Sequence, residues 1–301
     1  MITYKKLYQP DNLKENEIIL DIETTGLDSS SDQLVLLGII AYENEKCYIK
    51  QYFAEDNQEE KRLLEIYLNL IMDKTIINFN GDIFDIPFLN NRLIANELFP
   101  VFPDSYDVLK EISSKRKFFV FESMKLIDLE KKIGIFRDDP SRYKVISKLT
   151  DDIIKRDKPK PIMVHNENDL IATEKLVNIS DYFNEELSIN LLDNKITLNS
   201  SFINNDIGKF ILTSEKPFTN SYFNGPNYEL RIEEDKIDIN LQVLYGKFDE
   251  NTKGFVALNT FNLNNKSNLN VDPKLLVIKE NYTYNYKNIL NLSKKIIETH
   301  L

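Results

Sequence analysis

The chain has 301 residues, of which 42% are hydrophobic and 29% are charged, and this composition is typical of a globular protein. Its length allows one sizeable hydrophobic core and a smaller second module. The formal net charge of -10 argues against a protein that holds nucleic acid by overall attraction, so that local basic clusters or bound metal would have to supply it.

Cysteine content and hydropathy restrict the class of protein further. Cys47 is the only cysteine, so the sequence can form no disulfide within the chain and no zinc site of the cysteine-cluster type. The longest apolar runs, such as residues 34–42, have the length of strands rather than of membrane spans. The first residues lack the apolar segment and the small-residue cleavage site of a signal peptide. We therefore expect a cytoplasmic location and no membrane association.

The first structured segment, residues 17–27, is an apolar, β-branched run that ends in two acids and a turn, which predicts a strand. Side chains alternate across a strand, so Asp21 and Glu23 point to the same face. Two ionised carboxylates on a strand that is covered on both sides repel each other, and a divalent cation such as Mg²⁺ or Mn²⁺ would compensate them. The alternative is a strand whose last residues emerge into solvent and carry acids for solubility.

The sequence before and after this strand has simpler patterns. Residues 1–16 are expected to be a short polar lead-in. After the first strand we expect two more strands joined by a hairpin turn, then an amphipathic helix and a short strand. These four elements cover residues 33–42, 46–54, 58–72 and 75–79.

The middle of the chain is expected to be mostly helical. Asp85 follows the short strand and opens a helix that reaches about residue 98, with Pro87 in its first turn. Residues 106–154 have mainly helical character, and the clearest helix, residues 123–133, ends at Gly134. A basic, proline-stiffened loop then leads to a helix over residues 163–183.

The last third of the chain has a different character, with many asparagines and short alternating segments. We place a domain boundary between residues 189 and 190, which gives a catalytic domain over 1–189 and a small α+β accessory domain over 190–301. Four strands and a closing helix are expected in the second domain. They cover residues 228–232, 236–245, 254–261, 275–278 and 286–299.

Four acids on three separate elements form the candidate catalytic group. Asp21 and Glu23 come from the first strand, Asp85 from the start of a helix, and Asp169 from a late helix on which His165 lies one turn earlier. Two metal ions about 3.5–4 Å apart need several shared carboxylates around them and catalyse phosphoryl transfer. His165 has a side chain suited to accept the proton of the attacking water. Alternatively, Asp85 is a first-turn acid that stabilises its helix, and His165 is a surface histidine.

Three sequence motifs resemble those of the DnaQ-like (DEDD) exonucleases of the ribonuclease H-like superfamily. Residues 20–27 look like their first motif, and Phe79-Asn80-Gly81 with residues 84–89 is similar to their second. His165-Asn166 with Asp169 resembles the third motif in the form found in the YprB-like ribonuclease H domain family. Residues 123–126, 134–135 and 137–139 look like the middle region of that family. The resemblance covers about the first 185 residues.

This resemblance implies a fold, a reaction and a set of metal ligands. The implied fold is α/β, with a ribonuclease H-like mixed sheet whose first three strands are antiparallel and which is flanked by helices. The implied reaction is 3′-to-5′ hydrolysis of nucleic acid with two Mg²⁺ or Mn²⁺ ions. Asp21, Glu23, Asp85 and Asp169 would be the metal ligands, and His165 the general base. The four-residue spacing of His165 and Asp169 is that of the tyrosine subclass, so His165 occupies a tyrosine-like position.

Substrate contacts are expected from the turns that follow the catalytic acids. These candidate contact residues are Thr24, Thr25, Gly26, Asn80 and Asn166. The expected partner is DNA or RNA, with a single-stranded 3′ end, and the sequence does not distinguish the two. Two basic segments, residues 115–119 and 155–160, are candidates for contacting a nucleic-acid backbone, although such runs are commonly solvated faces.

Two competing hypotheses remain. The first is a non-catalytic module that binds nucleic acid or protein and retains the ribonuclease H-like fold. The second is an acid-pair hydrolase, such as a glycosidase that uses Asp21 and Glu23 and would not need Asp85 or Asp169.

Overall fold

The computed structural model describes residues 1–132, 134 and 146–301, and these form two compact units. The first unit consists of Met1–Ser113 and Glu122–Ile179. The second consists of Ser114–Phe121 and Ser180–Leu301. The domain boundary expected between residues 189 and 190 stays a prediction.

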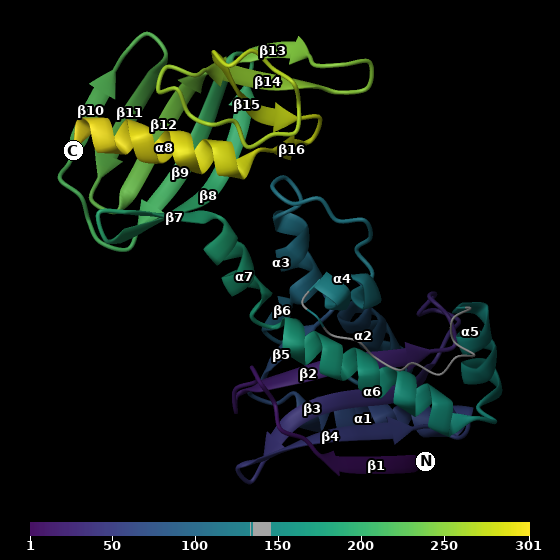
Figure 1. Cartoon of the computed structure of the whole chain (residues 1–301). Coiled ribbons are helices and arrows are strands. Elements are labelled where there is room, and N and C mark those ends of the chain that lie inside the picture. Colours follow the sequence, from purple (N-terminus) through teal and green to yellow (C-terminus); the bar gives the residue numbers. More distant parts are fainter. Residues whose placement is uncertain (133, 135–145) are drawn as a thin grey trace. The chain divides into compact units, whose positions relative to one another are not determined.

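A six-stranded mixed sheet forms the centre of the first unit (Figure 1). Its four consecutive antiparallel strands are joined by two parallel ones, because β5 pairs with β2 and β6 pairs with β5 in the parallel sense. In spatial order the strands are β1 (Ile2–Leu7), β4 (Lys46–Phe53), β3 (Leu34–Glu43), β2 (Glu17–Thr24), β5 (Thr75–Asn78) and β6 (Ser105–Asp107).

Local sequence explains the central strands. β2 and β3 are apolar along most of their length and are buried on both faces, as expected of strands covered by helices on each side. β3 and β4 form a tight hairpin whose two turn residues, Asn44 and Glu45, have φ values of 50° and 64°. Two consecutive positive φ values give the turn a twist that matches the flanking strands.

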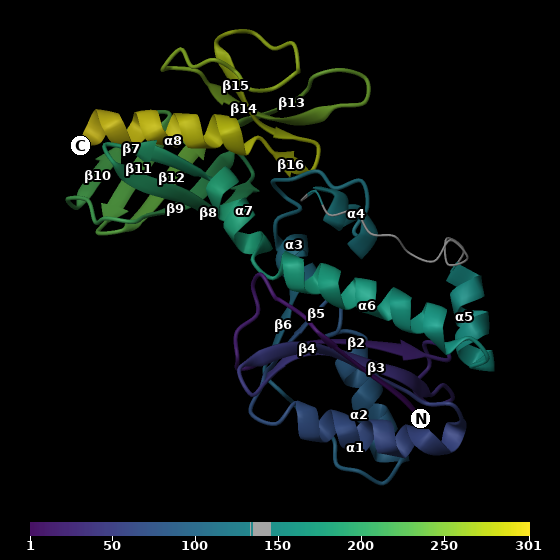
Figure 2. The ribbon, with the colours of Figure 1, turned by 60° about the horizontal axis from the view of Figure 1, so that its bottom comes forward.

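Helices cover both faces of this sheet (Figure 2). On one face, β2 packs through Ile18 and Leu20 against α1 (Glu60–Leu70) and α2 (Asp85–Ala95). On the other face, Val35 and Leu36 of β3 pack against the two helices that come later in the chain. These are α5 (Ile146–Lys155) and α6 (Pro159–Leu176), and the remaining described helices of the unit are α3 (Val108–Ser114) and α4 (Leu126–Lys132).

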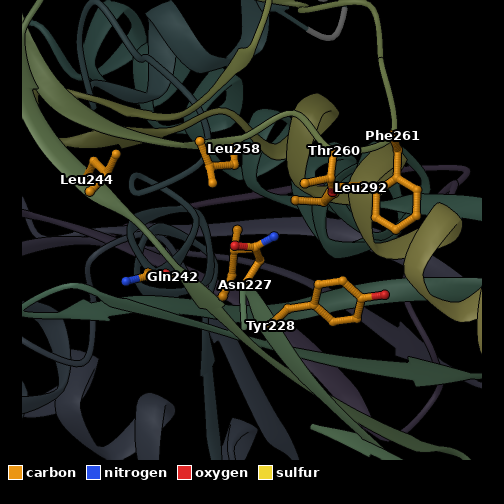
Figure 3. Close-up of a pocket in the computed structure, with 9 residues that line it drawn as sticks. Asn227, Tyr228, Gln242, Leu244, Leu258, Thr260, Phe261 and Leu292 are labelled. Carbon is orange, nitrogen blue, oxygen red and sulfur yellow. The ribbon is translucent and has the colours of Figure 1, made fainter. Parts of the chain in front are cut away.

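The second unit contains two antiparallel sheets and two helices. The six-stranded sheet has the order β10-β11-β12-β9-β8-β7, and the four-stranded sheet has the order β13-β14-β15-β16. One hydrophobic core joins both sheets to α8 (Tyr286–His300) and includes Phe118. A small cavity of about 90 Å³ lies beside this core, and Figure 3 shows leucine, tyrosine and phenylalanine side chains around it.

The elements of the second unit have the following bounds. They are α7 (Ile179–Glu186), β7 (Ser188–Leu191), β8 (Asn194–Asn204), β9 (Ile207–Ser214), β10 (Ser221–Asn224), β11 (Tyr228–Glu233), β12 (Lys236–Gln242), β13 (Leu244–Lys247), β14 (Lys253–Leu258), β15 (Leu275–Glu280) and β16 (Thr283–Tyr284).

The expected fold class is confirmed: a mixed sheet flanked by helices, with further sheets in the C-terminal part. The antiparallel arrangement of β2, β3 and β4 is confirmed as well. The described part of the chain contains no helix with both the length and the apolar character that a membrane crossing requires.

Sequence analysis missed several strands. Residues 1–16 contain β1, an edge strand whose side chains are mostly exposed and which therefore lacks an apolar pattern. Residues 106–154 are mostly helical where they are described, as expected, but β6 ends there at Asp107 and residues 115–125 lie in no helix. The strands from β7 to β10 were also missed. Predictions for residues 133 and 135–145, including the motif residues 137–139, lie outside the described residues.

A buried ion pair ties α1 to α2. Arg92 donates from Nε to Glu60 Oε1 at 2.8 Å and from Nη2 to Oε2 at 2.7 Å, and Leu34 N donates to Glu60 Oε1 at 2.8 Å. Removing one partner would leave the other charge buried and uncompensated.

We therefore expect Arg92→Met to lower the free energy of unfolding by roughly 3–5 kcal/mol. Urea titration followed by circular dichroism measures this change. The control is Lys131→Met, which removes an exposed partner of Asp128 and should leave the midpoint unchanged. A small loss for Arg92→Met, equal to that of the control, would contradict the assignment.

Candidate active site

Asp21 and Glu23 lie on β2, on the face of the sheet that α6 covers. In the register of the sheet, Asp21 is opposite Gly38 of β3, and Glu23 is opposite Leu36. The register shifts between Glu23 and Thr24, so β2 is irregular at the point where the two acids end the strand. Such irregularities commonly direct side chains into a site.

A buried hydrogen-bond network holds the carboxylate of Asp21. Asn166 of α6 donates from Nδ2 to Asp21 Oδ2 at 2.7 Å. Gln51 of β4 donates from Nε2 to Asn166 Oδ1 at 2.8 Å and to the carbonyl oxygen of Met163 at 2.7 Å. Asn166 and Gln51 are both fully buried. These bonds give Asn166 a positioning function, and its expected contact with substrate stays a prediction.

Gly38 makes room for this network. A Cβ atom at position 38 would lie 2.0 Å from Asn166 Oδ1, which no side chain can tolerate without a shift. Asp21, Gly38 and Gln51 are neighbours across three adjacent strands, so Asn166 lies over the glycine and reaches both polar residues. Position 38 therefore requires glycine, because the side chain of Asn166 lies directly against its backbone.

Asp85 lies at the first position of α2 and is buried, with 6% of its surface exposed. Burial raises the pKa of Asp85 to about 7, while hydrogen bonds from the backbone N–H groups of Asp85 itself and of Ile22 oppose the rise. The bond from Ile22 places the Asp85 carboxylate beside β2.

Asp107 is a further acid of this site that sequence analysis did not single out. It ends β6, is 6% exposed, and its charge raises the pKa of Asp85. Asp107 Oδ1 accepts hydrogen bonds at 2.9 Å from the backbone N–H groups of Asn80 and Leu109. The available signal was an acid at the end of a strand and before a helix, but the expected helical character of residues 106–154 obscured it.

Asn80 has a φ of 68°, a left-handed conformation that asparagine adopts more readily than most residues. Asp107 fixes this conformation through the Asn80 N–H. Asn80 also lines a cavity of about 610 Å³, together with Ile83 and Phe102, whose side chains are mostly exposed. This volume is within the usual range of small-ligand sites.

His165 and Asp169 lie on one face of α6, as expected from their spacing. His165 Nε2 is 3.5 Å from Asp169 Oδ2, and the two side chains are 19% and 20% exposed. Both are therefore accessible to solvent while close to each other.

The pKa values of Asp21 and Glu23 report the charges of the other predicted catalytic residues nearby. Burial raises the pKa of Asp21 well above its usual range, and the charges of Asp169, Asp85 and Glu23 raise it further. Burial raises the pKa of Glu23 to about 8; His165 opposes this rise, and Asp169 and Asp85 add to it. Asp85, Asp169 and His165 thus lie close enough to β2 to change the pKa of Asp21 or Glu23.

The predicted contact residues of the first turn hold the turn together. Thr24 Oγ1 donates to the carbonyl oxygen of Gly26 at 2.7 Å. Thr25 Oγ1 donates to Asp32 Oδ1 at 3.1 Å and accepts from the N–H of Gln33 at 2.9 Å. Their expected contact with substrate stays a prediction.

A preformed metal cage is not present in the described residues. Across residues 1–132, 134 and 146–301, no group of three or more His, Cys, Asp or Glu side chains is arranged to hold a metal ion. The donor chemistry nonetheless suits a hard cation, because Asp21, Glu23, Asp85 and Asp169 offer carboxylate oxygens, and the charges of Asp85 and Asp169 act on Asp21 and Glu23.

Residues 18–180 match the family model of the ribonuclease H superfamily. The chain belongs to this superfamily. A search of curated proteins gave no match. Among solved structures, the chain is similar to the family B DNA polymerase from the hyperthermophilic archaeon Pyrobaculum calidifontis, with a TM-score of 0.44 and 16% identity over 56% of this chain and 25% of that one.

Another similar solved structure is the zinc-bound E. coli exonuclease I in complex with single-stranded DNA. The TM-score is 0.35 and the identity 13%, over 67% of this chain and 54% of the exonuclease chain. This member of the ribonuclease H superfamily therefore spans a quarter of the polymerase and about half of the exonuclease.

The close approach at Gly38 generates a first prediction for the site. Gly38→Ala should displace Asn166, release Asp21 and lower the free energy of unfolding by roughly 1–3 kcal/mol through overpacking. The control is Gly246→Ala, because a Cβ at Gly246 has no atom within 4 Å. Equal free energies of unfolding of the two variants, measured by urea titration, would contradict the contact between Gly38 and Asn166.

The raised pKa values generate a second prediction. A carboxyl group whose folded-state pKa is raised binds its proton more tightly in the folded chain, so it stabilises the fold at acid pH and loses this effect as the pH rises. For Glu23 the window runs from the ordinary value of 4.5 to about 8.

In the presence of a chelator, we expect the melting temperature to fall as the pH is raised through this window, and Glu23→Gln to flatten the dependence. Differential scanning fluorimetry across the window measures both curves. Glu65→Gln, on the exposed face of α1, should retain the wild-type slope. A Glu23→Gln curve parallel to wild type would be inconsistent with the raised pKa.

Proposed function

We propose that the chain is a metal-dependent nuclease that hydrolyses phosphodiester bonds of nucleic acid from the 3′ end, as in the DnaQ-like (DEDD) class. The observation that carries this proposal is that the charges of Asp85 on α2 and Asp169 on α6 raise the pKa values of Asp21 and Glu23 on β2. Acids from α2 and α6 raise the pKa values of two acids on a central strand, and perturbed pKa values of this kind are common in catalytic sites.

Asp21, Glu23, Asp85 and Asp169 would hold two Mg²⁺ or Mn²⁺ ions. Such ions, when bound, lower the pKa of a water molecule and neutralise charge on the attacking and leaving oxygens of the phosphoryl group. Since the pKa of Glu23 is raised to about 8 and that of Asp85 to about 7, these two carboxyl groups retain protons near neutral pH in the metal-free chain, and the pKa of Asp21 is raised in the same direction. The carboxyl groups of Glu23 and Asp85 would release these protons on holding the ions.

Residues of the chain would orient the reaction and move its proton. His165 is partly exposed beside Asp169 and can accept the proton of the attacking water. Asn166 fixes the carboxylate of Asp21, and Asp107 fixes the backbone of Asn80 at the edge of the cavity. A terminal nucleotide fits in this cavity, where Phe102 offers an exposed ring to a base.

The proposed substrate is DNA or RNA with a single-stranded 3′ end. The Thr24–Gly26 backbone and Asn80 are the proposed contacts with the terminal nucleotide, because they border the acids and already have fixed conformations. The buried Asn166 is less suited to such a contact.

A test uses purified protein with end-labelled DNA and RNA oligonucleotides and Mn²⁺. We expect a ladder of single-nucleotide steps from the 3′ end that Asp21→Ala abolishes. Asp169→Ala should abolish it too, and His165→Ala should slow it roughly 10²- to 10⁴-fold, the usual contribution of a general base. Glu65→Ala is the matched exposed control and should retain full activity.

Different outcomes identify the competing hypotheses. Binding of oligonucleotides without any cleavage by the wild type would support a non-catalytic module. An activity that needs Asp21 and Glu23 but survives Asp85→Ala and Asp169→Ala would support an acid-pair hydrolase. Either result contradicts the proposed nuclease.

A further inference from the structure

The second unit contains an open groove that the proposed nuclease site does not involve. Its volume is about 570 Å³. The groove lies between the β15–β16 hairpin, the start of α8 and the segment Ser114–Phe121; the hairpin and the helix are yellow in Figure 1. Its lining combines tyrosines, lysines and asparagines. The residues used below are Lys266, Glu280, Asn281, Tyr282, Tyr286 and Lys287.

Tyr282 presents an aromatic ring from a rigid turn at the edge of the groove. Its side chain is 89% exposed, and it occupies a two-residue turn between Glu280 and Thr283. The other turn residue, Asn281, donates from N to the carbonyl oxygen of Lys253 at 2.6 Å and accepts from Lys253 N at 3.2 Å. Because the backbone is already fixed, ordering this ring against a ligand costs little conformational entropy.

Lysines line the groove beside the exposed ring. Lys266 and Lys287 are exposed, and the backbone of Lys266 is held by a 2.7 Å hydrogen bond from its N–H to Asn288 Oδ1. Glu280 is the acid among the described lining residues, and its Oε1 is engaged by Ser267 Oγ at 2.7 Å. The cations thus outnumber the acid, and the acid already has a hydrogen-bond donor.

More cations lie over aromatic rings near the groove. Lys279 Nζ is 4.6 Å from the centroid of the Tyr284 ring, and Lys287 Nζ is 5.8 Å from that of Tyr286. Desolvation and the charge of Lys115 lower the pKa of Lys117, whose Nζ lies 5.1 Å from the Phe118 ring. These lysines add positive charge around the exposed ring of Tyr282, and the combination suits a ligand that carries both flat faces and negative charges.

Charge is distributed unevenly between the two units. The second unit contains 16 Lys and Arg residues and 16 Asp and Glu residues. The first unit contains 22 Lys and Arg residues and 32 Asp and Glu residues. The whole formal charge of -10 therefore belongs to the first unit. A polyanion is repelled less by the second unit than by the first, so the second unit is the better place for an initial contact.

We propose that this groove binds single-stranded nucleic acid. A base stacks on Tyr282, and phosphates lie against the ammonium groups of Lys266 and Lys287. An acidic peptide could satisfy the lysines, but it would leave the projecting ring without a flat partner, so the exposed tyrosine favours a nucleic-acid strand. The proposal does not require hydrolysis and concerns residues far in sequence from the catalytic acids.

The experiment measures binding of a fluorescein-labelled oligo-dT to the full chain by anisotropy, with chelator present and Asp21→Ala as the background to prevent cleavage. Tyr282→Ala should weaken binding roughly 5- to 150-fold, the usual effect of losing one base–aromatic stack. Lys266→Gln with Lys287→Gln should also weaken binding. The dependence of log affinity on log salt concentration should become shallower, with a slope smaller in magnitude by about 1.4.

Matched controls come from the same unit. Tyr222→Ala removes an exposed tyrosine of β10, and Lys236→Gln with Lys247→Gln removes two exposed lysines outside the groove. Both controls should bind as the background protein does. Unchanged affinity in the groove variants would overturn the proposal, as would preferential binding of poly-glutamate. If the groove variants lose binding but the wild type shows no cleavage with Mn²⁺, the nuclease proposal fails and this one stands.

Discussion

The site depends on repulsion between carboxylates that the fold holds together in a poorly solvated place. Asp21 and Glu23 share a face because strand side chains alternate, and the fold adds Asp85 from α2 and Asp169 from α6. Each ionised neighbour makes ionisation of the next less favourable, and burial reinforces this effect. Such a cluster costs stability unless protons or cations compensate it, which is why its presence indicates a function.

The surrounding structure restrains these acids through neutral polar groups. Gln51 orients Asn166, and Asn166 in turn orients Asp21, in a chain of bonds that runs from β4 to β2 beneath α6. Gly38 permits the chain because its missing side chain leaves room for an amide. On the other side, Asp107 fixes the backbone of the Asn80 turn that leads to Asp85. Neutral donors position the acids without cancelling the charge that a cation would bind.

Sequence patterns predicted the parts of this arrangement that depend on local periodicity. The period-2 pattern of β2 placed Asp21 and Glu23 on one face, and the four-residue spacing placed His165 and Asp169 on one helical face. The sequence could not reveal the roles of Gly38, Gln51 and Asn166, because these depend on contacts between residues more than 100 positions apart. Their roles follow only from the three-dimensional packing.

Edge strands and the second unit were harder to predict for physical reasons. β1 pairs with β4 through its backbone but buries little, so its sequence shows no apolar alternation. β6 has three residues, too few to show a period. The segment Ser114–Phe121 lies in sequence between two parts of the first unit, and Phe118 packs into the core of the second unit. The local sequence of such a short segment does not indicate which hydrophobic core its side chains join.

The central claim is that the carboxyl groups at the end of β2 exchange protons for divalent cations. Calorimetric titration of the chain with Mn²⁺ near neutral pH, in two buffers that differ in ionisation enthalpy, tests it most directly, because the difference in heat reports the protons released. Since the pKa of Glu23 is raised to about 8 and that of Asp85 to about 7, the account predicts saturable binding with proton release, lost in a Glu23→Gln, Asp85→Asn double variant. Binding without proton release, or binding that the double variant retains, would contradict it.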